Sequence, residues 1–288
     1  MIVVADEVRE AQAVVALETT LVAHGFPEGE GVAVGLEAEE RVRAAGAVPA
    51  TIGVLDGKIR VGVSAGELER FDVSARKVGP RDLATCAVQG EVGATTVGGT
   101  LAVCRAAGIQ FMGTGGLGGV HRGFPHPPDV SADLGQLART QALVVSAGMK
   151  SFLDVAATVE ILEALGVPLL GFGTDTLPLF YAAPGGPPVP ARVDSAEDAA
   201  RVAEAHWELG GGGILLARPP DESLDDIEPL IDEALEEAGR RKVTGPVLTP
   251  FVLSFLHERS GGRTLVANRA LVAANAGLAA EVAVAWKR

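Results

Sequence analysis

One stretch of this chain decides both its fold and its chemistry: Ala142-Leu143-Val144-Val145-Ser146-Ala147-Gly148-Met149-Lys150. Its apolar run is typical of a strand that is buried on both faces of a parallel sheet. Residues 151–165 follow with the periodicity of a helix, so the two segments together predict a strand–helix unit. Lys150 stands at the junction, where we expect partial dehydration and the positive end of the helix dipole.

Lys150 is a candidate nucleophile. The chain has only five lysines against nineteen arginines, so lysine is not its usual cation. Dehydration and a helix dipole both disfavour the ammonium form, which leaves a neutral, nucleophilic amine. The alternative is a lysine that extends from a core element to water, and for an arbitrary lysine this alternative is the more frequent.

Composition limits the classes of function. The chain has 288 residues, 48% of them hydrophobic, and a net charge of −13. Such a charge argues against a nucleic-acid partner, although a small phosphorylated ligand needs only local donors. No run of eighteen clean apolar residues predicts a membrane span, and the start of the chain lacks the pattern of a signal peptide. Cys86 and Cys104 are expected to be buried small hydrophobes, so we expect a reducing cytoplasm.

Strand-like and helix-like segments alternate along the chain. This alternation predicts an α/β fold, with one mostly parallel sheet covered by helices on both faces, in a single catalytic domain spanning residues 1–288. The C-terminal third is expected to be mostly helical. The predicted strands are 13–17, 50–55, 58–63, 109–112, 142–148, 168–172 and 214–217. The predicted helices are 31–45, 81–89, 96–107, 151–165, 195–209, 224–238, 250–258 and 264–286.

Three polar features follow predicted strands. They are Lys150, Glu18 and the glycine-rich run Gly113–Gly119. Ligands of such sheets bind beyond the carboxyl ends of the strands, so we expect these features to meet in one site. The glycine run contains G-x-G-x-x-G, but the residues from Val120 to Pro128 that follow it cannot form the helix of a dinucleotide site. No organic cofactor is therefore expected, and two readings remain: an anion site with Thr114 and His121, or an ordinary tight loop.

Carboxylates supply the other candidates. Asp129 and Asp133 suit a hydrated Mg²⁺ or Mn²⁺ ion, but the same residues are consistent with a helix cap in which Ser131 or Asp129 begins a helix over 134–140. Glu18 lies in an apolar stretch, where a raised pKa would make it a general acid, unless it forms a buried ion pair. Lys77 and Arg81 either bind phosphate or merely solvate a loop.

The chain resembles the pseudouridine-5′-phosphate glycosidases, a family that also includes proteins called indigoidine synthase A. Nine stretches carry the resemblance, in the family's order, from Ala16 to Glu281. They are ALETTLVAHGFP, PATIGVLDGKIRVG, GGTLAV, GTGGLGGVHRG, DVSADLGQLART, VVSAGMKSFLDV, GFGTDTLPLFY, TPFVL and ANRALVAANAGLAAE.

The resemblance implies cleavage of pseudouridine 5′-phosphate to uracil and ribose 5-phosphate, with a divalent metal, usually Mn²⁺, in a homotrimer. It implies that Lys150 is the covalent nucleophile, that Glu18 is the proton donor and that Asp129 binds the metal. It implies substrate contacts for Lys77, Val97, Ser131, Ala132 and Asp133, and further site roles for His121 and Asn268, with Asn275 as a rival for the asparagine.

Other functions share parts of this pattern. A class I aldolase-like enzyme acting on another sugar phosphate would use Lys150 without needing contacts to uracil. A catalytically silent phosphosugar-binding protein would need neither Lys150 nor Glu18. A family member that serves a pigment pathway would keep the same site residues.

Overall fold

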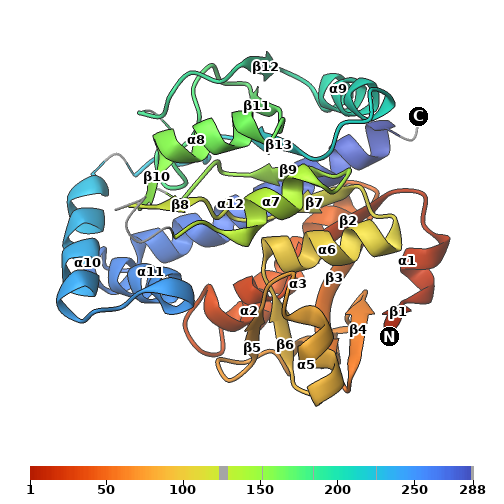
Figure 1. Ribbon diagram of the computed structural model, residues 1–288, viewed down its shortest axis with the longest axis horizontal. Helices are drawn as coiled ribbons and strands as arrows, with labels where there is room; N and C mark the ends of the chain where they lie inside the picture. Colours follow the sequence, from red (N-terminus) through yellow and green to blue (C-terminus); the bar gives the residue numbers. More distant parts are fainter. Residues whose placement is uncertain (123–128, 151, 184, 225, 287–288) are drawn as a thin grey trace.

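The computed structural model describes residues 1–122, 129–150, 152–183, 185–224 and 226–286. Eleven strands form one sheet (Figure 1), and its main path runs β1 (Ile2–Val4), β4 (Lys58–Val61), β3 (Val48–Leu55), β2 (Val14–Glu18), β7 (Phe111–Gly113), β9 (Leu143–Ser146), β13 (Ile214–Ala217), β11 (Leu169–Phe172) and β12 (Ala191–Val193). β5 (Arg76–Val78) and β6 (Gly93–Thr95) join it at β3. Among the described strands of this sheet, only the pairs β3–β4 and β3–β6 are antiparallel, so the predicted mostly parallel sheet is confirmed.

Side chains on the central strands alternate between two buried faces. In β2, Val15 and Leu17 belong to one hydrophobic cluster, whereas Ala16 belongs to the other. In β9, Val144 and Val145 divide in the same way. Because neither face meets water, these strands read as unbroken apolar runs instead of alternating ones.

Helices cover both faces, as predicted, with α6, α7 and α8 on the near side of the sheet in Figure 1 and α12 crossing on the far side. The far cluster receives side chains from α3 (Gly31–Ala44), α9 (Ala196–Glu208), α10 (Glu228–Arg240), α11 (Leu248–Arg259) and α12 (Arg263–Trp286). The near cluster receives them from α1 (Asp6–Glu10), α5 (Leu83–Gln89), α6 (Val97–Ala107), α7 (Ala132–Ala138) and α8 (Val155–Ala164). The shorter elements are α2 (Thr20–His24), α4 (Ala65–Leu68), η1 (Gly245–Val247) and the pair β8 (Val120–His121) and β10 (Leu153–Asp154).

The C-terminal region is helical, as expected. Its last helix, α12, is long and apolar enough to cross a membrane, which the inspection of the sequence missed. Half of its most apolar window is nevertheless buried inside the protein, where it packs against α3, α9, β2, β7 and β9. Its hydrophobicity is therefore accounted for by its position as a core helix.

The helix after Lys150 begins later than predicted. α8 starts at Val155, because Asp154 accepts a hydrogen bond from the Ala157 amide (3.0 Å) and acts as the N-cap. Leu153 and Asp154 instead form β10, and the Leu153 amide closes a turn onto the Lys150 carbonyl (3.0 Å). The prediction that Lys150 lies at the end of a helix dipole was therefore wrong, and Ser151 lies outside the described residues.

The short elements were missed. β1, β5, β6 and β12 have three residues each, too few to show a period of two. The helix predicted from residue 224 begins at Glu228, where Pro229 favours a first helical turn. Of the residues from Val120 to Pro128, which were predicted not to be helical, Val120 and His121 form β8, and residues 123–128 lie outside the described part of the chain.

An aromatic cluster ties the sheet to the far helices. Phe111 in β7 contacts Trp207 of α9 and Trp286 of α12, with ring centroids 6.0 and 5.6 Å apart. We expect Phe111→Ala to lower the free energy of unfolding by about 3–5 kcal/mol, because it leaves a cavity between three elements. Urea denaturation checks this. The control, Leu209→Ala, changes a side chain that is 88% exposed, and it should alter the free energy of unfolding by less than about 0.5 kcal/mol. Equal losses in the two variants would contradict the role of Phe111 in tying the sheet to the far helices.

Candidate active site

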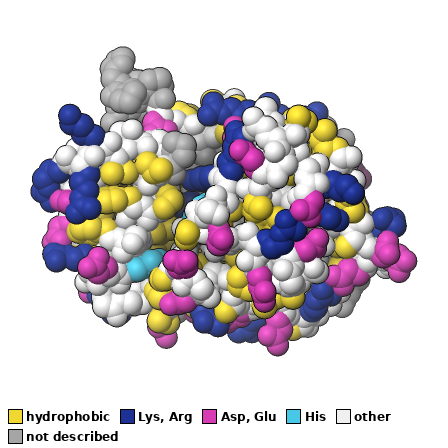
Figure 2. Space-filling model, turned by 90° about the horizontal axis from the view of Figure 1, so that it is seen from below, with side chains coloured by type: hydrophobic (Ala, Val, Ile, Leu, Met, Phe, Trp, Pro, Cys, Tyr) yellow, Lys and Arg dark blue, Asp and Glu magenta, His cyan; other side chains and the backbone are white. Residues whose placement is uncertain are grey.

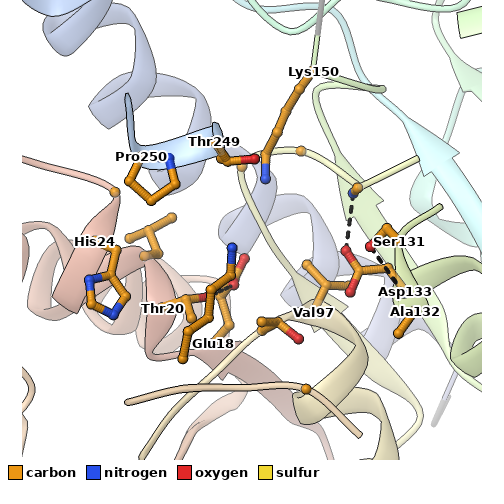
Figure 3. A pocket seen from close by; sticks show the side chains of 18 of the residues that line it. Glu18, Thr20, His24, Val97, Ser131, Ala132, Asp133, Lys150, Thr249 and Pro250 are labelled. Carbon is orange, nitrogen blue, oxygen red and sulfur yellow. Dashed lines mark hydrogen bonds between the residues drawn. The ribbon is translucent and has the colours of Figure 1, made fainter. Parts of the chain in front are cut away.

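One cavity lies at the carboxyl ends of β2, β7 and β9. Its volume is about 760 Å³, within the range of small-molecule sites. Glu18, Lys77 and Lys150 line it, together with the glycine run. Figure 3 shows Lys150 and Glu18 pointing into it from opposite sides. The expectation that the polar features after three strands meet in one site is confirmed.

Backbone geometry around Gly148 places Lys150. Gly148 has φ of +76°, and a Cβ atom there would lie 2.0 Å from the Pro178 carbonyl oxygen, so only glycine fits. The Ser146 hydroxyl donates to the Gly148 carbonyl (2.9 Å), and the Phe180 amide donates to the Ala147 carbonyl (2.9 Å). The chain before Lys150 is thus held between β9 and residues 177–182.

Glu18 ends β2, and this half-buried residue lines the cavity. Burial raises the pKa of Glu18, while the positive charge of Lys150 and hydrogen bonds from Thr114 and Thr20 act in the opposite direction. The Thr114 hydroxyl donates to Oε1 (2.5 Å), and the Thr20 hydroxyl lies against Oε2. Glu18 therefore has the environment of a proton donor, and Thr114 lies behind it, outside the set of residues that line the cavity.

Lys77 and Arg81 occupy different places. Lys77, in β5, is largely buried; burial lowers the pKa of Lys77, the charge of Lys150 lowers it further, and Asp133 and Glu18 oppose both effects. The Arg81 side chain is 91% exposed at the rim, 3.8 Å from Asp82. Of the two cations proposed from the sequence, only Lys77 faces the interior of the site.

Three residues at the start of α7, Ser131, Ala132 and Asp133, support the site. The Ser131 hydroxyl accepts a hydrogen bond from the Asp133 amide (3.2 Å) and is the N-cap of α7, which Ala132 begins. The Asp133 carboxylate accepts from the amides of Gly98 (2.7 Å) and Gly118 (3.1 Å). A Cβ atom on Gly118 would lie 2.6 Å from this carboxylate. The first turn of α6 and the glycine run are thus joined through Asp133.

Asp129 is the residue that fits a metal ion. Within the described residues its carboxylate makes no hydrogen bond or ion pair, and Ser131 fills the capping role that was its alternative. The His121 amide donates to the Asp129 carbonyl (2.9 Å), and His121 Nδ1 is buried without a hydrogen-bond partner among those residues. No described group of three His, Cys, Asp or Glu side chains surrounds a common point. The residues present therefore fit a hydrated cation held by one carboxylate.

The histidine and the asparagines are also located. Burial lowers the pKa of His121, the charge of Asp129 opposes this, and the nearby lysines reinforce it. Asn268 lines the cavity and donates to the Gly25 carbonyl (3.4 Å). Asn275 lies one layer behind and donates to the Thr114 carbonyl (2.8 Å). Asn268 is thus the asparagine of the site.

Inspection of the sequence missed several contributors to the cavity, among them Phe180, Thr249 and Pro250. Figure 3 shows Thr249 and Pro250 beside Lys150, where α11 brings them. Phe180 has φ of +63°, and its ring closes the cavity over Gly116. The stretches GFGTDTLPLFY and TPFVL contain all three residues, so the signal was present but pointed to no individual side chain. Val97, at the start of α6, lines the cavity as expected.

Comparison with known proteins agrees with this geometry. A family model described as Indigoidine synthase A like protein matches residues 3–285. The chain belongs to this family. Two similar proteins, from Nocardioides sp. and Geobacillus kaustophilus, are named pseudouridine-5′-phosphate glycosidase; they are 46% and 44% identical, and the alignments cover 97% and 98% of this chain and 94% and 97% of theirs.

Two solved structures have the same fold. One is an indigoidine synthase A-like protein from Thermotoga maritima, with a TM-score of 0.90 and 38% identity. The other is the prealnumycin C-glycosynthase AlnA in complex with ribulose 5-phosphate, with a TM-score of 0.89 and 39% identity. Each comparison covers 100% of this chain and 97% of the other.

The raised pKa of Glu18 predicts a pH-dependent stability. The unfolded chain releases this proton at lower pH than the folded protein, so the folded state loses stability as pH rises through the folded pKa. Glu18→Gln removes this ionisation, and we expect the variant to melt above the wild type at pH 8.5 and close to it at pH 4.5. Calorimetry at both pH values checks this. Exposed Glu69→Gln is the control; a Glu18→Gln advantage that is larger at pH 4.5 would contradict the shift.

Proposed function

We propose that this protein cleaves the C–C glycosidic bond of pseudouridine 5′-phosphate, giving uracil and ribose 5-phosphate, in pseudouridine catabolism. The observation that carries the proposal is that Lys150 and Glu18, whose pKa is raised by burial, line one cavity. The names of the similar proteins from Nocardioides and Geobacillus support the substrate, and the C-glycosynthase supports chemistry at a C-glycosidic bond.

The bond to be broken joins two carbons, so simple protonation of a leaving oxygen, as in ordinary glycosidases, is not enough. In the proposed mechanism Glu18 gives its proton to the ring oxygen, and electrons of the uracil ring open the furanose. The amine of Lys150 then adds to C1′. These two residues lie on opposite sides of the cavity, which allows them to act on the two sides of C1′.

Cleavage follows from the adduct. The added nitrogen loses a proton, uracil C5 gains one, and the nitrogen lone pair forms an iminium at C1′ as the C1′–C5 bond breaks. Water then adds to C1′; its hydroxyl stays on the sugar, its proton returns to Glu18, and Lys150 leaves as an amine. The net reaction consumes one water. In this scheme Lys77 supplies positive charge inside the cavity, which suits the 5′-phosphate or the uracil oxygens.

We further propose that Asp129 holds a divalent cation, with Mn²⁺ the expected ion and His121 close by. Such an ion would supply Lewis acidity and order water near the uracil oxygens. Ser131, Ala132, Asp133, Val97 and Asn268 would complete the walls around the substrate, with Thr114 setting the position of Glu18.

The assembly and setting are part of the same proposal. A homotrimer in the cytoplasm is expected from the family resemblance, and exposed apolar side chains such as Val88, Leu209 and Val266 offer surface for subunit contacts. On the face drawn in Figure 2, Lys and Arg side chains are interspersed with Asp and Glu. This distribution supports a small-molecule partner over nucleic acid.

Incubation with pseudouridine 5′-phosphate and Mn²⁺ tests the function directly. We expect free uracil by chromatography, and loss of at least about 10³-fold in rate for Lys150→Ala, because the covalent path is removed. Borohydride reduction in the presence of ribose 5-phosphate should add the mass of the reduced sugar phosphate at Lys150.

Lys242→Ala, a surface lysine substitution, is the matched control and should retain both properties. An active Lys150→Ala variant, or a trapped sugar on another lysine, would remove Lys150 from the mechanism. Release of a different product from another sugar phosphate would favour the aldolase-like alternative.

The metal role of Asp129 has its own test. Because its carboxylate has no hydrogen-bond or ion-pair partner among the described residues, we expect Asp129→Asn to weaken Mn²⁺ binding about tenfold or more, read by calorimetry or electron paramagnetic resonance without substrate. Asp82→Asn, at the rim of the same cavity, should bind Mn²⁺ like the wild type. Unchanged affinity in Asp129→Asn would show that the ion binds elsewhere.

A further inference from the structure

The carboxyl group of Glu18 lies between two hydroxyl groups that come from different elements. Thr114, which follows β7, donates to Oε1 (2.5 Å). Thr20, the first residue of α2, lies against Oε2. Each oxygen of this carboxyl group therefore has its own hydroxyl partner.

The two threonines differ in their other contacts. The Thr20 hydroxyl oxygen is also 3.0 Å from the carbonyl oxygen of Thr95. The Thr114 hydroxyl makes no second hydrogen bond within the described residues. A hydroxyl carries one hydrogen and cannot donate to two acceptors at once. The Thr114 hydroxyl thus has one available acceptor. The Thr20 hydroxyl has two, and it can donate either to the carboxyl group of Glu18 or to the Thr95 carbonyl.

The surroundings make the acceptor to which the Thr20 hydroxyl donates depend on the charge of Glu18. Thr20 is 8% exposed and Thr95 is fully buried, so water offers little replacement for a lost partner. Three charged side chains face Glu18: Lys150 and Asp133 act on it directly, and Lys77 feels its charge in turn. None of them contacts the Thr20 hydroxyl, so its orientation is set by Glu18 and Thr95.

We propose that Thr20 is a positioning residue whose hydroxyl hydrogen turns from the Thr95 carbonyl to Glu18 each time Glu18 gives up its proton. This inference rests on the proposed role of Glu18 as proton donor. In the acid form, the Glu18 proton is donated to the Thr20 oxygen and the Thr20 hydrogen to Thr95. Once the proton has passed to the substrate, the Thr20 hydrogen turns to the carboxylate. The rotation of the Thr20 hydroxyl itself transfers no proton, and the new carboxylate gains a hydrogen-bond donor at once.

A turning hydroxyl and a fixed donor predict different effects on titration. Loss of a fixed donor, Thr114, destabilises the carboxylate form of Glu18 more than its acid form, and so raises the pKa of Glu18. Loss of the turning hydroxyl removes one charge-assisted hydrogen bond from the carboxylate but two neutral ones from the acid. A charge-assisted bond is about twice as strong as a neutral one, so these losses nearly cancel.

Infrared difference titration measures the carboxyl band of protonated Glu18, which is assigned by its absence in Glu18→Gln. We expect the midpoint to move to higher pH in Thr114→Val and to stay near the wild-type value in Thr20→Val. We also expect kcat for uracil release to fall about tenfold in Thr20→Val, because Oε2 then has no hydroxyl partner in either form of the carboxyl group. Thr20→Ser, which keeps the hydroxyl, should restore kcat.

Thr100→Val is the matched control. Thr100 is a buried threonine that pairs with the Thr95 hydroxyl (2.9 Å) and does not touch Glu18, so its variant should keep the wild-type midpoint and kcat. Thr20→Ala gives the same readout if Thr20→Val does not fold. If the midpoint in Thr20→Val moves as far as in Thr114→Val, or if kcat is unchanged, the proposal that the Thr20 hydroxyl turns is wrong. A wild type that releases no uracil overturns the proposed function instead, while the titration still tests the hydroxyl.

Discussion

The carboxyl group of Glu18, which faces two lysines in one cavity, is the constraint on which this site depends. Glu18, Lys77 and Lys150 share one cavity, and removal of charged groups from water is costly unless they are paired or neutral. The structure meets this cost locally. Burial raises the pKa of Glu18 and lowers the pKa of Lys77, so both shifts reduce the charge that the cavity must hold. The raised pKa of Glu18 also favours the protonated form that general acid catalysis needs.

The need to stabilise a charged group away from water also explains the glycine run. Gly113–Gly119 has the letters of a dinucleotide motif, yet the anion that it holds belongs to the protein itself. Asp133 accepts the amides of Gly98 and Gly118 and so fixes the start of α6 against the run. A side chain on either glycine would collide with this carboxylate. Backbone amides that elsewhere bind phosphate thus serve here to fix the walls of the cavity.

Much of the fold and site follows from residue patterns, and the exceptions have physical causes. β9 and β13 are unbroken apolar runs, and α3 is a 14-residue segment with a helical period, so all three are visible in the sequence. β5 has three residues, and only pairing with β6 makes it a strand and brings Lys77 to the cavity. Thr249 comes from the far end of the chain, so no local pattern could place it beside Lys150. Spacing likewise cannot tell a free carboxylate, Asp129, from one that backbone amides already occupy.

The likeness to a C-glycosynthase follows from the proposed chemistry. An enzyme lowers the barriers to a reaction and to its reverse by the same amount, so a site that breaks a C1′–C5 bond through a lysine adduct also assembles one from an open-chain sugar phosphate and a carbon nucleophile. The structural neighbour binds ribulose 5-phosphate, whose open-chain form carries a carbonyl group that an amine can attack. Synthesis and cleavage then differ in the carbon partner and in the access of water to the iminium. Both differences concern the lining of the cavity that holds Lys150, to which Phe180, Thr249 and Pro250 contribute.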